Sequence, residues 1–318
     1  MKRALVCVTA VALLVGVFGC SDNELTVAPT PAGLNSEALT TAPVVDGQVD
    51  AVWAGVTAYN VTVGQDANYQ NAYGQTTVTM KAATVNNTLY ILAEWTDPSA
   101  TESINKKRWQ NTAGVWSVGL EDEDRFFIMF DAGDNGVEGA DCATMCHQPT
   151  AGLMATSGGG HVDVWHWKAA RTNPAGFLDD KWWDGVGRGS DAKVTSGYTD
   201  NLDLIAGNTP QFMHSTGTAY TGDFLFEADK VAFDGNLNWT GLSIPYYVID
   251  PAATGSRWEV AAKGVYAAGK WTLEMSRSFN TGNPDDVVLG TGSVQVTVAI
   301  TDNSGSQHSG SSPFNLNF

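Results

Sequence analysis

Residues 77–95 read TVTMKAATVNNTLYILAEW and indicate antiparallel β-structure. The two arms, 77–82 and 89–95, are rich in Val, Thr, Ile, Tyr and Trp, the residue types that favour strands. Asn86 and Asn87 stand between the arms, and asparagine tolerates the left-handed backbone of a short hairpin turn. The stretch therefore predicts a hairpin of two strands.

Strand patterns recur on both sides of this hairpin. They are residues 125–130 (RFFIMF), 161–168 (HVDVWHWK), 258–263 (WEVAAK), 270–275 (KWTLEM) and 294–300 (VQVTVAI), the third and fourth forming a second hairpin around Ala268 and Gly269. We find no long amphipathic helix, and we expect a short one around residues 142–147. The loops 97–124, 131–160 and 172–245 are long, and such loops usually bind something. We predict a mainly β protein, an antiparallel β-sandwich with long loops and short helices.

Composition and charge narrow the class of function. The 318 residues include 17 Lys and Arg against 34 Asp and Glu, a formal net charge of −17. Such an acidic chain lacks the basic footprint of a nucleic-acid-binding protein, and anionic lipid repels it. Hydrophobic residues make up 43% of the chain, which is enough to build a core and excludes global disorder.

The first residues are typical of an export signal. Lys2 and Arg3 precede an apolar run at 4–18, which has the length of a signal-peptide core and is short for a membrane span. We therefore expect residues 1–19 to be a signal peptide. Removing it would change the formal net charge from −17 to −19, because two basic residues leave with it.

The end of this apolar run predicts a lipid anchor. Gly19-Cys20 resembles a bacterial lipoprotein box, in which the cysteine receives lipid; an ordinary signal peptide with an incidental cysteine is the alternative. Residues 20–42 read as a flexible tether, and residues 43–318 as one folded domain. The protein is thus expected to be exported and held by lipid alone, at the periplasmic face of a membrane or at the outer membrane of a bacterium.

The motif that carries the chemistry is residues 142–147, CATMCH, which has the form C-x-x-x-C-H. The common signature of c-type heme attachment is C-x-x-C-H, in which two thiols add to the heme vinyl groups and the histidine ligates iron. One additional residue is compatible with this chemistry, because Cys142 and Cys146 would lie on one face of a helical turn. We expect one heme c, attached at Cys142 and Cys146, with His147 as an axial ligand.

Three other interpretations of this motif compete with heme attachment. A disulfide between Cys142 and Cys146 would close a very small loop and add little stability. A zinc site would need four ligands, and the mature chain offers no further cysteine except Cys20. A redox-active dithiol would leave the adjacent His147 without a role.

Four stretches together resemble a known family. Residues 44–53 (VVDGQVDAVW) resemble the opening of a β-sandwich superfamily that includes family-9 carbohydrate-binding modules and the heme-binding domain of ethylbenzene dehydrogenase gamma subunits. Residues 124–130 (DRFFIMF), 162–171 (VDVWHWKAAR) and 269–277 (GKWTLEMSR) resemble the cytochrome c-552/dimethyl-sulfoxide-reductase-like heme-binding domain in order and spacing. The resemblance covers residues 43–318.

The resemblance implies which residues hold the iron. In the gamma-subunit relatives the heme is b-type, not covalently held, and ligated by a methionine and a lysine. The motif of His147 stands about where those relatives place the methionine, and Lys263 lies at about the position of the lysine. His166 and His161 are the alternatives for the second ligand. Strand alternation places these two on opposite faces, so at most one of them can meet the same iron.

Other side chains have weaker claims to a site. Four tryptophans could wall a porphyrin, although tryptophan more often belongs to a core. They are Trp165, Trp167, Trp182 and Trp183. His308 is expected to be exposed to solvent. The acidic runs 121–124 and 131–141 could hold calcium, but their spacing does not match an EF-hand, and a solvated acidic loop is favoured.

These features together predict an electron carrier that is not itself an enzyme, namely a lipid-anchored monoheme c-type cytochrome. Its partners would be redox proteins, and its acidic surface suits docking to a basic one. A ligand- or carbohydrate-binding sandwich is the second hypothesis, which the C-x-x-x-C-H motif disfavours. A heme electron-transfer subunit of a molybdenum oxidoreductase is the third.

Overall fold

The computed structural model describes residues 33–64, 75–104, 106–133, 139–141, 155–156, 158–205, 208–305 and 308–318. The chain divides into two units, Met1–Pro31, which lies outside the described residues, and Ala32–Phe318. The described residues of the second unit form strands and short 3-10 helices, with no α-helix among them. The 3-10 helices are η1 (Ala51–Gly55), η2 (Asn173–Ala175), η3 (Gly217–Ala219) and η4 (Ser256–Trp258). The predicted mainly β class is confirmed.

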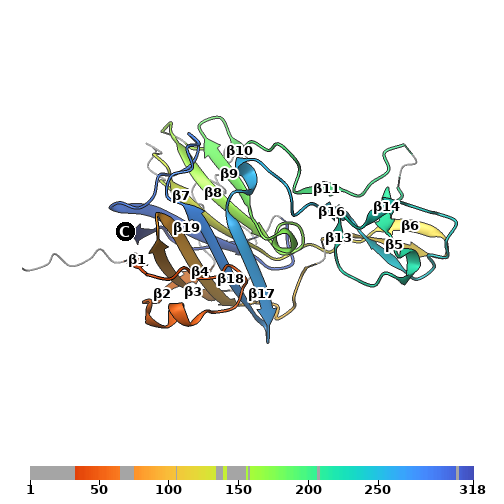
Figure 1. The fold of residues 1–318 in the computed structure, drawn as a ribbon, viewed down its shortest axis with the longest axis horizontal. Coiled ribbons are helices and arrows are strands. Elements are labelled where there is room, and N and C mark those ends of the chain that lie inside the picture. The colour runs from red at the N-terminus through yellow and green to blue at the C-terminus, as the bar shows by residue number, and fades with distance from the viewer. Residues whose placement is uncertain are drawn as a thin grey trace, which may run out of the picture. The chain divides into compact units, whose positions relative to one another are not determined.

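Seven strands make up what we call the first sheet. Six follow the order β10-β9-β8-β7-β19-β21, and β20 pairs with β19. Their bounds are β7 (Arg125–Asp131), β8 (His161–Lys168), β9 (Asp179–Asp184), β10 (Arg188–Ser190), β19 (Ser293–Thr301), β20 (Ser309–Gly310) and β21 (Phe314–Asn317). All neighbouring pairs among them are antiparallel. Strand β19, far along the chain, lies beside β7 (Figure 1).

The second sheet has the order β3-β4-β18-β17, with β2 paired to β3. Its strands are β2 (Tyr59–Val63), β3 (Thr76–Val85), β4 (Thr88–Thr96), β17 (Ala261–Ala267) and β18 (Lys270–Ser278). Strand β1 (Gly33–Ala38) joins the two sheets, because its first residues pair in parallel with β21 and its last with β3. Residues 33–38 were expected to belong to the tether, so the ordered fold begins earlier than the predicted Pro43.

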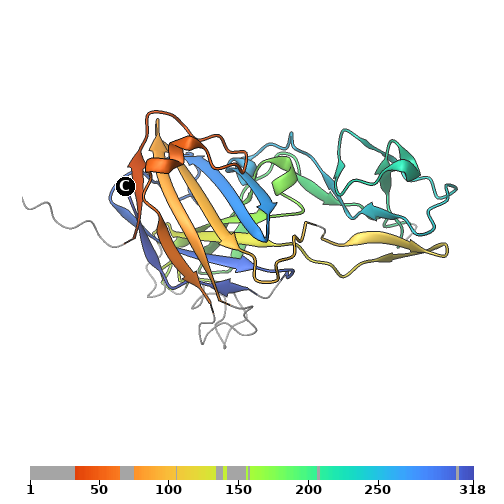
Figure 2. The same ribbon diagram turned by 90° about the horizontal axis from the view of Figure 1, so that it is seen from below.

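The two sheets pack face to face around one hydrophobic core (Figure 2). Ile91 and Leu273 of the second sheet and Phe126, Trp165 and Val298 of the first are almost completely buried in it. Alternate residues of each strand point inward to this core, so the remaining residues of the first sheet point to its outer face. The predicted antiparallel β-sandwich is confirmed.

Three smaller sheets are built from the segments between β4 and β7 and between β9 and β17. They are β11-β16-β13, β12-β14 and β15-β5-β6, from β5 (Arg108–Thr112), β6 (Val115–Val118), β11 (Tyr198–Asp200), β12 (Phe212–His214), β13 (Leu225–Phe226), β14 (Lys230–Ala232), β15 (Ser243–Pro245) and β16 (Tyr247–Ile249). Trp109, Trp239 and Tyr246 belong to a separate aromatic cluster there. Residues 97–124 and 172–245 are therefore not the structureless loops that the sequence predicted.

Both predicted hairpin turns are present. Asn86 and Asn87 have φ values of 48° and 61°, and Ala268 and Gly269 have 52° and 77°. The strand predicted at 258–263 begins later, at Ala261. Trp258 instead ends η4, where its indole N–H donates to the Thr195 carbonyl at 2.9 Å.

Candidate functional site

The outer face of the first sheet carries a large cavity. Its volume is about 570 Å³, within the range of about 300–1,000 Å³ typical of small-molecule sites. Phe127, Met129, His166, Trp183 and Ala299 are among the residues that line it. They come from β7, β8, β9 and β19, so adjacent strands of a rigid sheet form its floor.

Strand register explains why these side chains meet. His166 on β8 lies directly opposite Phe127 on β7, and Phe127 lies opposite Ala299 on β19. Met129 lies two residues further along β7, opposite Val164. Because side chains on one face of a sheet recur every second residue, the row that includes His166 forms one continuous surface. His166 therefore points to the outer face of the first sheet.

His166 is the most unusual side chain in the cavity. It is 8% exposed, and its Nε2 atom is buried with no hydrogen-bond partner. The Phe127 ring stacks on the imidazole with 4.1 Å between centroids. Burial, and then the charge of Lys168, hold the pKa of His166 well below its ordinary value. A neutral imidazole with an unengaged ring nitrogen is the form that ligates a metal.

Positive side chains surround this histidine. Five lining residues are lysine or arginine, and none of the described lining residues is aspartate or glutamate. They are Arg125, Lys168, Arg171, Lys181 and Arg188. The carboxylates that pair with most of these cations lie behind the lining, so the surface of the cavity itself favours an anionic ligand.

Buried carboxylates behind the lining hold these cations in place. Asp179 is 0% exposed and pairs with Lys168 and Arg257, while it accepts a hydrogen bond from the Tyr198 hydroxyl at 2.8 Å. Burial alone would raise the pKa of Asp179, but Lys168, Lys181 and Arg257 outweigh this and hold it well below its ordinary value. Asp179 is thus ionised and orients the positive side chains.

The acidic run 121–124 contributes to the same framework. Glu123 is 0% exposed and accepts hydrogen bonds from Arg171 Nε at 2.8 Å and from the Ala170 amide at 3.0 Å. Asp124 is 2% exposed. The expectation of a solvated acidic loop is therefore wrong for these two residues, because each is needed as an acceptor inside the fold.

The C-x-x-x-C-H motif lies outside the described residues, as does Cys20, but residues 139–141 before it and 155–156 after it are described. Just before it, the Ala140 amide donates to Gln295 Oε1 at 2.9 Å, and its carbonyl accepts from the Thr297 hydroxyl. Gln295 and Thr297 lie on the same face of β19 as the cavity residue Ala299. After the motif, the Thr156 amide donates to the Asp184 carbonyl of β9 at 2.9 Å.

The other predicted ligands lie in different places. Lys263 is on β17 in the second sheet, where its Nζ donates to the Asn173 carbonyl at 3.1 Å, and it is not among the residues that line the cavity. His161 is on the opposite face of β8 from His166, as alternation predicts. The structure therefore brings His166 alone, of these three, to the cavity.

His308 also lines the cavity. The His308 ring lies 6.2 Å from that of Phe127 and is only partly exposed, so the expectation that it would be solvent-exposed is wrong. Of the four tryptophans proposed as a porphyrin wall, only Trp183 lines the cavity. Trp165 and Trp167 belong to the core.

Sequence reasoning missed Phe127 and Met129. The alternation of residues 125–130, read beside that of 161–168, could have placed both on the His166 face once the two strands were paired. Lys181 lies on β9 opposite Val164, so the pairing of β8 with β9 places it on the same face. Arg171 carried no such signal, because it follows the end of β8.

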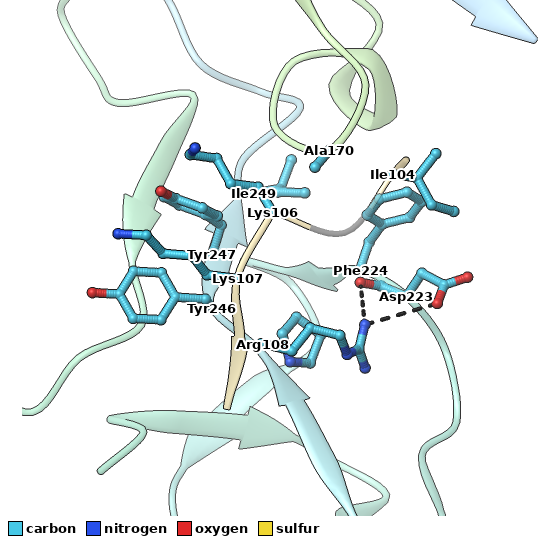
Figure 3. Close-up of a pocket in the computed structure, with 11 residues that line it drawn as sticks. Ile104, Lys106, Lys107, Arg108, Ala170, Asp223, Phe224, Tyr246, Tyr247 and Ile249 are labelled. Atoms are coloured by element: carbon cyan, nitrogen blue, oxygen red, sulfur yellow. Dashed lines mark hydrogen bonds and ion pairs between the residues drawn. The ribbon is translucent and has the colours of Figure 1, made fainter. Parts of the chain in front are cut away.

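A second pocket lies beside β5, β15 and β16 (Figure 3). Its volume is about 10 Å³, which is room for about one water molecule. Arg108 Nη1 donates a hydrogen bond to the Asp223 carbonyl at 3.1 Å and forms an ion pair with the Asp223 carboxylate at 3.8 Å. This pocket is too small for a cofactor.

The opening stretch 44–53 has a structural role. Trp53 is 0% exposed, and its indole N–H donates to Glu274 Oε1 at 2.8 Å. The amides of Asp46 and Gly47 donate to the other oxygen of Glu274. All 11 tryptophans of the chain are described, and each is buried or partly buried.

Most of the chain matches a known protein family. Residues 50–312 match the protein family described as ethylbenzene dehydrogenase. The chain belongs to this family. No curated protein matches it.

Solved structures similar to this family member include two carbohydrate-binding proteins. One is a family-9 carbohydrate-binding module from Caldicellulosiruptor kristjanssonii in complex with glucose, with TM-score 0.34, 12% identity, and coverage of 89% of this chain and 84% of that one. Another is a protein from Bacteroides uniformis described as carbohydrate-binding, with TM-score 0.39, 7% identity, and coverage of 90% and 91%. None of the described helices has the length and hydropathy that a membrane-spanning helix needs.

Proposed function

We propose that this protein is an electron carrier with one heme c, held in the cavity on the outer face of β7, β8, β9 and β19. The observation that carries the proposal is the buried, unpartnered Nε2 of His166 in a cavity lined by five cations. Heme has an apolar ring, an iron that accepts imidazole, and two carboxylates. The residues present fit each of these three parts. The resemblance to heme-binding gamma subunits adds support.

Attachment at Cys142 and Cys146, with His147 as the first axial ligand, is part of the proposal. Support comes from Ala140, which is held on the cavity face of β19 by Gln295 and Thr297. Cys142 follows Ala140 by two residues, a chain length of at most about 7 Å. The thioether chemistry is thus expected beside the cavity and not at a distant loop.

His166 is our proposed second axial ligand. It has a buried nitrogen to offer, whereas Lys263 is bonded to the Asn173 carbonyl on the other sheet. His161 would have to pass through the sheet to reach the same cavity. His166 therefore replaces the lysine that the family resemblance implies.

The chain's own residues would set the properties of the bound group. When bound, heme c supplies reversible one-electron transfer. His166 and Phe127 would orient the ring, and the cations would receive its carboxylates as charge-assisted partners. Positive charge and burial favour the ferrous over the more positive ferric state, so both raise the reduction potential.

Covalent attachment is tested by extraction. The purified protein, exported in a host that matures c-type cytochromes, should show Soret and α bands that change on reduction. Acid-acetone should leave the heme on the chain. In a Cys142→Ala, Cys146→Ala double variant the heme should become extractable. Heme that extracts from the unaltered protein would show that attachment is not covalent.

The second ligand is tested by paired substitutions on one strand. His166→Ala should convert a low-spin to a high-spin spectrum, while His161→Ala, on the opposite face of β8, should leave the spectrum unchanged. Lys263→Ala is the third arm. If Lys263→Ala alone abolishes the low-spin spectrum, the family's lysine ligand applies here and His166 does not ligate.

A partnership with a molybdenum oxidoreductase is the second proposal, favoured by membership of the ethylbenzene dehydrogenase family. In that case the protein would accept or donate electrons as a non-catalytic subunit. Affinity purification from the native host should recover a molybdenum-containing enzyme in stoichiometric amount. Recovery of the cytochrome alone would leave it as an independent carrier.

Export and lipid attachment at Cys20 complete the proposal. Metabolic labelling with palmitate, followed by mass spectrometry of the mature N-terminus, should find a lipid-modified cysteine in the membrane fraction. A Cys20→Ala variant should be unlabelled. A mature chain that starts at another residue and carries no lipid would show that residues 1–19 are part of an ordinary signal peptide and that Cys20 is not an anchor.

A further inference from the structure

Three buried carboxylates meet where strands of both sheets end. Asp97 follows β4, Asp124 precedes β7 and Asp302 follows β19. Each offers an oxygen within 4.8 Å of an oxygen of the others, and the residues are only 3%, 2% and 4% exposed. Burial, and then Asp302, raise the pKa of Asp97 to about 6. Like charges this close together are strongly unfavourable without a counter-ion.

The fold supplies hydrogen bonds to this cluster but no positive charge. Asp124 accepts from the Trp271 indole at 3.0 Å and from the amides of Ser103 and Asn303 at 3.1 and 3.0 Å. Among the described residues, no lysine or arginine forms an ion pair with any of the three carboxylates. Asp302 Oδ1 is buried without any hydrogen-bond partner. A buried, unpartnered carboxylate oxygen that belongs to an acidic cluster points to a missing cation.

We propose that Asp97, Asp124 and Asp302 bind one divalent cation of the calcium type. Carboxylate oxygens are the hard ligands that calcium prefers, at about 2.3–2.6 Å. The three ligand oxygens lie within 4.8 Å of one another, a separation that one ion bound at about 2.3–2.6 Å from each can span. Magnesium usually keeps several waters and takes one or two carboxylates, so three buried carboxylates favour calcium. Main-chain carbonyls and water would complete the coordination.

A second acidic cluster shows what the first lacks. Asp163, Asp180 and Asp286 are also close together and buried, but Arg277 lies among them and donates to Asp163 Oδ2 at 2.7 Å. That cluster carries its own cation. In the first cluster a metal ion would play the part of Arg277 and join β4 of the second sheet to β7 and β19 of the first.

Two of these carboxylates are also neighbours, along the chain, of residues that line the cavity on the first sheet. Asp124 immediately precedes Arg125, and Asp302 immediately follows Thr301, and both of these neighbours line the cavity. A bound cation would thus hold the ends of two strands that form the cavity floor. The inference does not depend on heme, because the three carboxylates need compensation whether or not the cavity is filled.

The test uses the full mature protein, stripped with a chelator and titrated with calcium chloride. We expect a rise in melting temperature of at least about 3 °C. Terbium, which replaces calcium, should show luminescence sensitised through Trp271. Asp302→Asn should weaken calcium affinity at least about tenfold, because the ligand charge falls. Asp229→Asn, at an exposed carboxylate outside the buried acidic groups, is the control and should bind calcium normally.

The chelated state separates a lost ligand from a damaged fold. Without calcium, Asp302→Asn should melt no lower than the unaltered protein, because the substitution relieves repulsion. Asp97→Asn is the second variant, in case the first does not fold. No calcium-dependent shift and no terbium signal in the unaltered protein would overturn the proposal. Loss of binding in Asp229→Asn with full binding in Asp302→Asn would overturn it as well.

Discussion

Arg277 shows how one buried side chain organises the interior of the sandwich. Its guanidinium is 1% exposed and donates to Asp163 on the facing sheet at 2.7 Å and to the Val287 carbonyl at 2.9 Å. It also lies over the Trp165 ring at 5.0 Å. A lone charge at this depth is strongly destabilising, so the guanidinium and the carboxylates around it must be buried together.

Replacing this arginine should be severe. Arg277→Met would leave several carboxylates buried without a counter-charge, and we expect a loss of about 3–5 kcal/mol in the free energy of unfolding. Lys270→Met on the same strand is the control. Lys270 pairs with Glu94 at 2.7 Å but is 46% exposed, so its loss should cost less than about 1 kcal/mol. Urea denaturation measures both, and equal losses would contradict this account.

Asp191 should make stability depend on pH. Burial, and then Asp285 and Asp286, raise its pKa to about 8, whereas an unfolded aspartate titrates near about 4. The folded chain therefore holds a proton that the unfolded chain has lost, so stability is present at low pH and falls as pH rises from about 4 to about 8. In Asp191→Asn this decline should be shallower, with denaturation at pH 5 and 8.5 as the measurement. An unchanged slope would show that Asp191 is ionised throughout.

Among the elements, the two hairpins show how turn chemistry sets register. The β3–β4 turn uses Asn86 and Asn87 at positive φ, and the β17–β18 turn uses Ala268 and Gly269. Asparagine and glycine tolerate the left-handed region, but in alanine the Cβ lies too close to the following carbonyl oxygen there, which is destabilising. The second turn thus stores strain that the first avoids.

Substitutions in that turn should act in opposite directions. Ala268→Gly should raise the free energy of unfolding by about 1 kcal/mol, because it removes a side chain from a φ of 52°. Gly269→Ala should lower it by a similar amount, since it adds one at 77° without a steric clash, the nearest atom being 3.8 Å away. Thermal melts of both variants test this, and changes of the same sign would contradict it.

Strand β1 has a different role among the elements. Its backbone pairs with β21 of the first sheet and then with β3 of the second, so one short strand closes one edge of the sandwich. Leu34 in this strand is 0% exposed and belongs to the shared core. Composition alone could not separate this strand from a tether, because its residues GLNSEA lack a strand-like pattern.

Over the whole molecule, charge is divided unevenly. The chain carries a net −17, yet five cations converge on the cavity of the first sheet. In the proposed heme complex these cations would face the carboxylates of the heme, and the acidic remainder of the chain would face partners. Long-range attraction would then bring a basic redox partner to the surface.

Electron exchange with a basic redox protein should therefore slow as salt rises. Screening shortens from about 30 Å at 0.01 M to about 8 Å at 0.15 M ionic strength, so steering should fade over this range. Stopped-flow reduction of the holoprotein measures the rate, and a small uncharged reductant is the control that salt should leave unaffected. A rate that rises with salt would show that the docking face is not acidic.

Local sequence patterns predicted the strands, both turns and the face of β8 to which His166 belongs. They could do so because side-chain alternation and turn preference depend on neighbouring residues alone. Heme attachment at the C-x-x-x-C-H motif is local in the same way, since thioether chemistry needs adjacent ligands, and it stays a prediction. The assignment of residues 33–38 to a tether was wrong, because pairing with β21 and β3 stabilises a segment of weak intrinsic preference.

Packing between distant segments decided the rest. The cavity exists because β19 lies beside β7, and His308 and Lys181 reach it from other parts of the chain. Asp97, Asp124 and Asp302 meet only because strands from both sheets end together. Burial and the loss of water make such groups chemically unusual, and neither can be computed from residue order. Sequence thus predicted a heme attachment motif, and tertiary contacts selected His166 over Lys263 as the proposed second ligand.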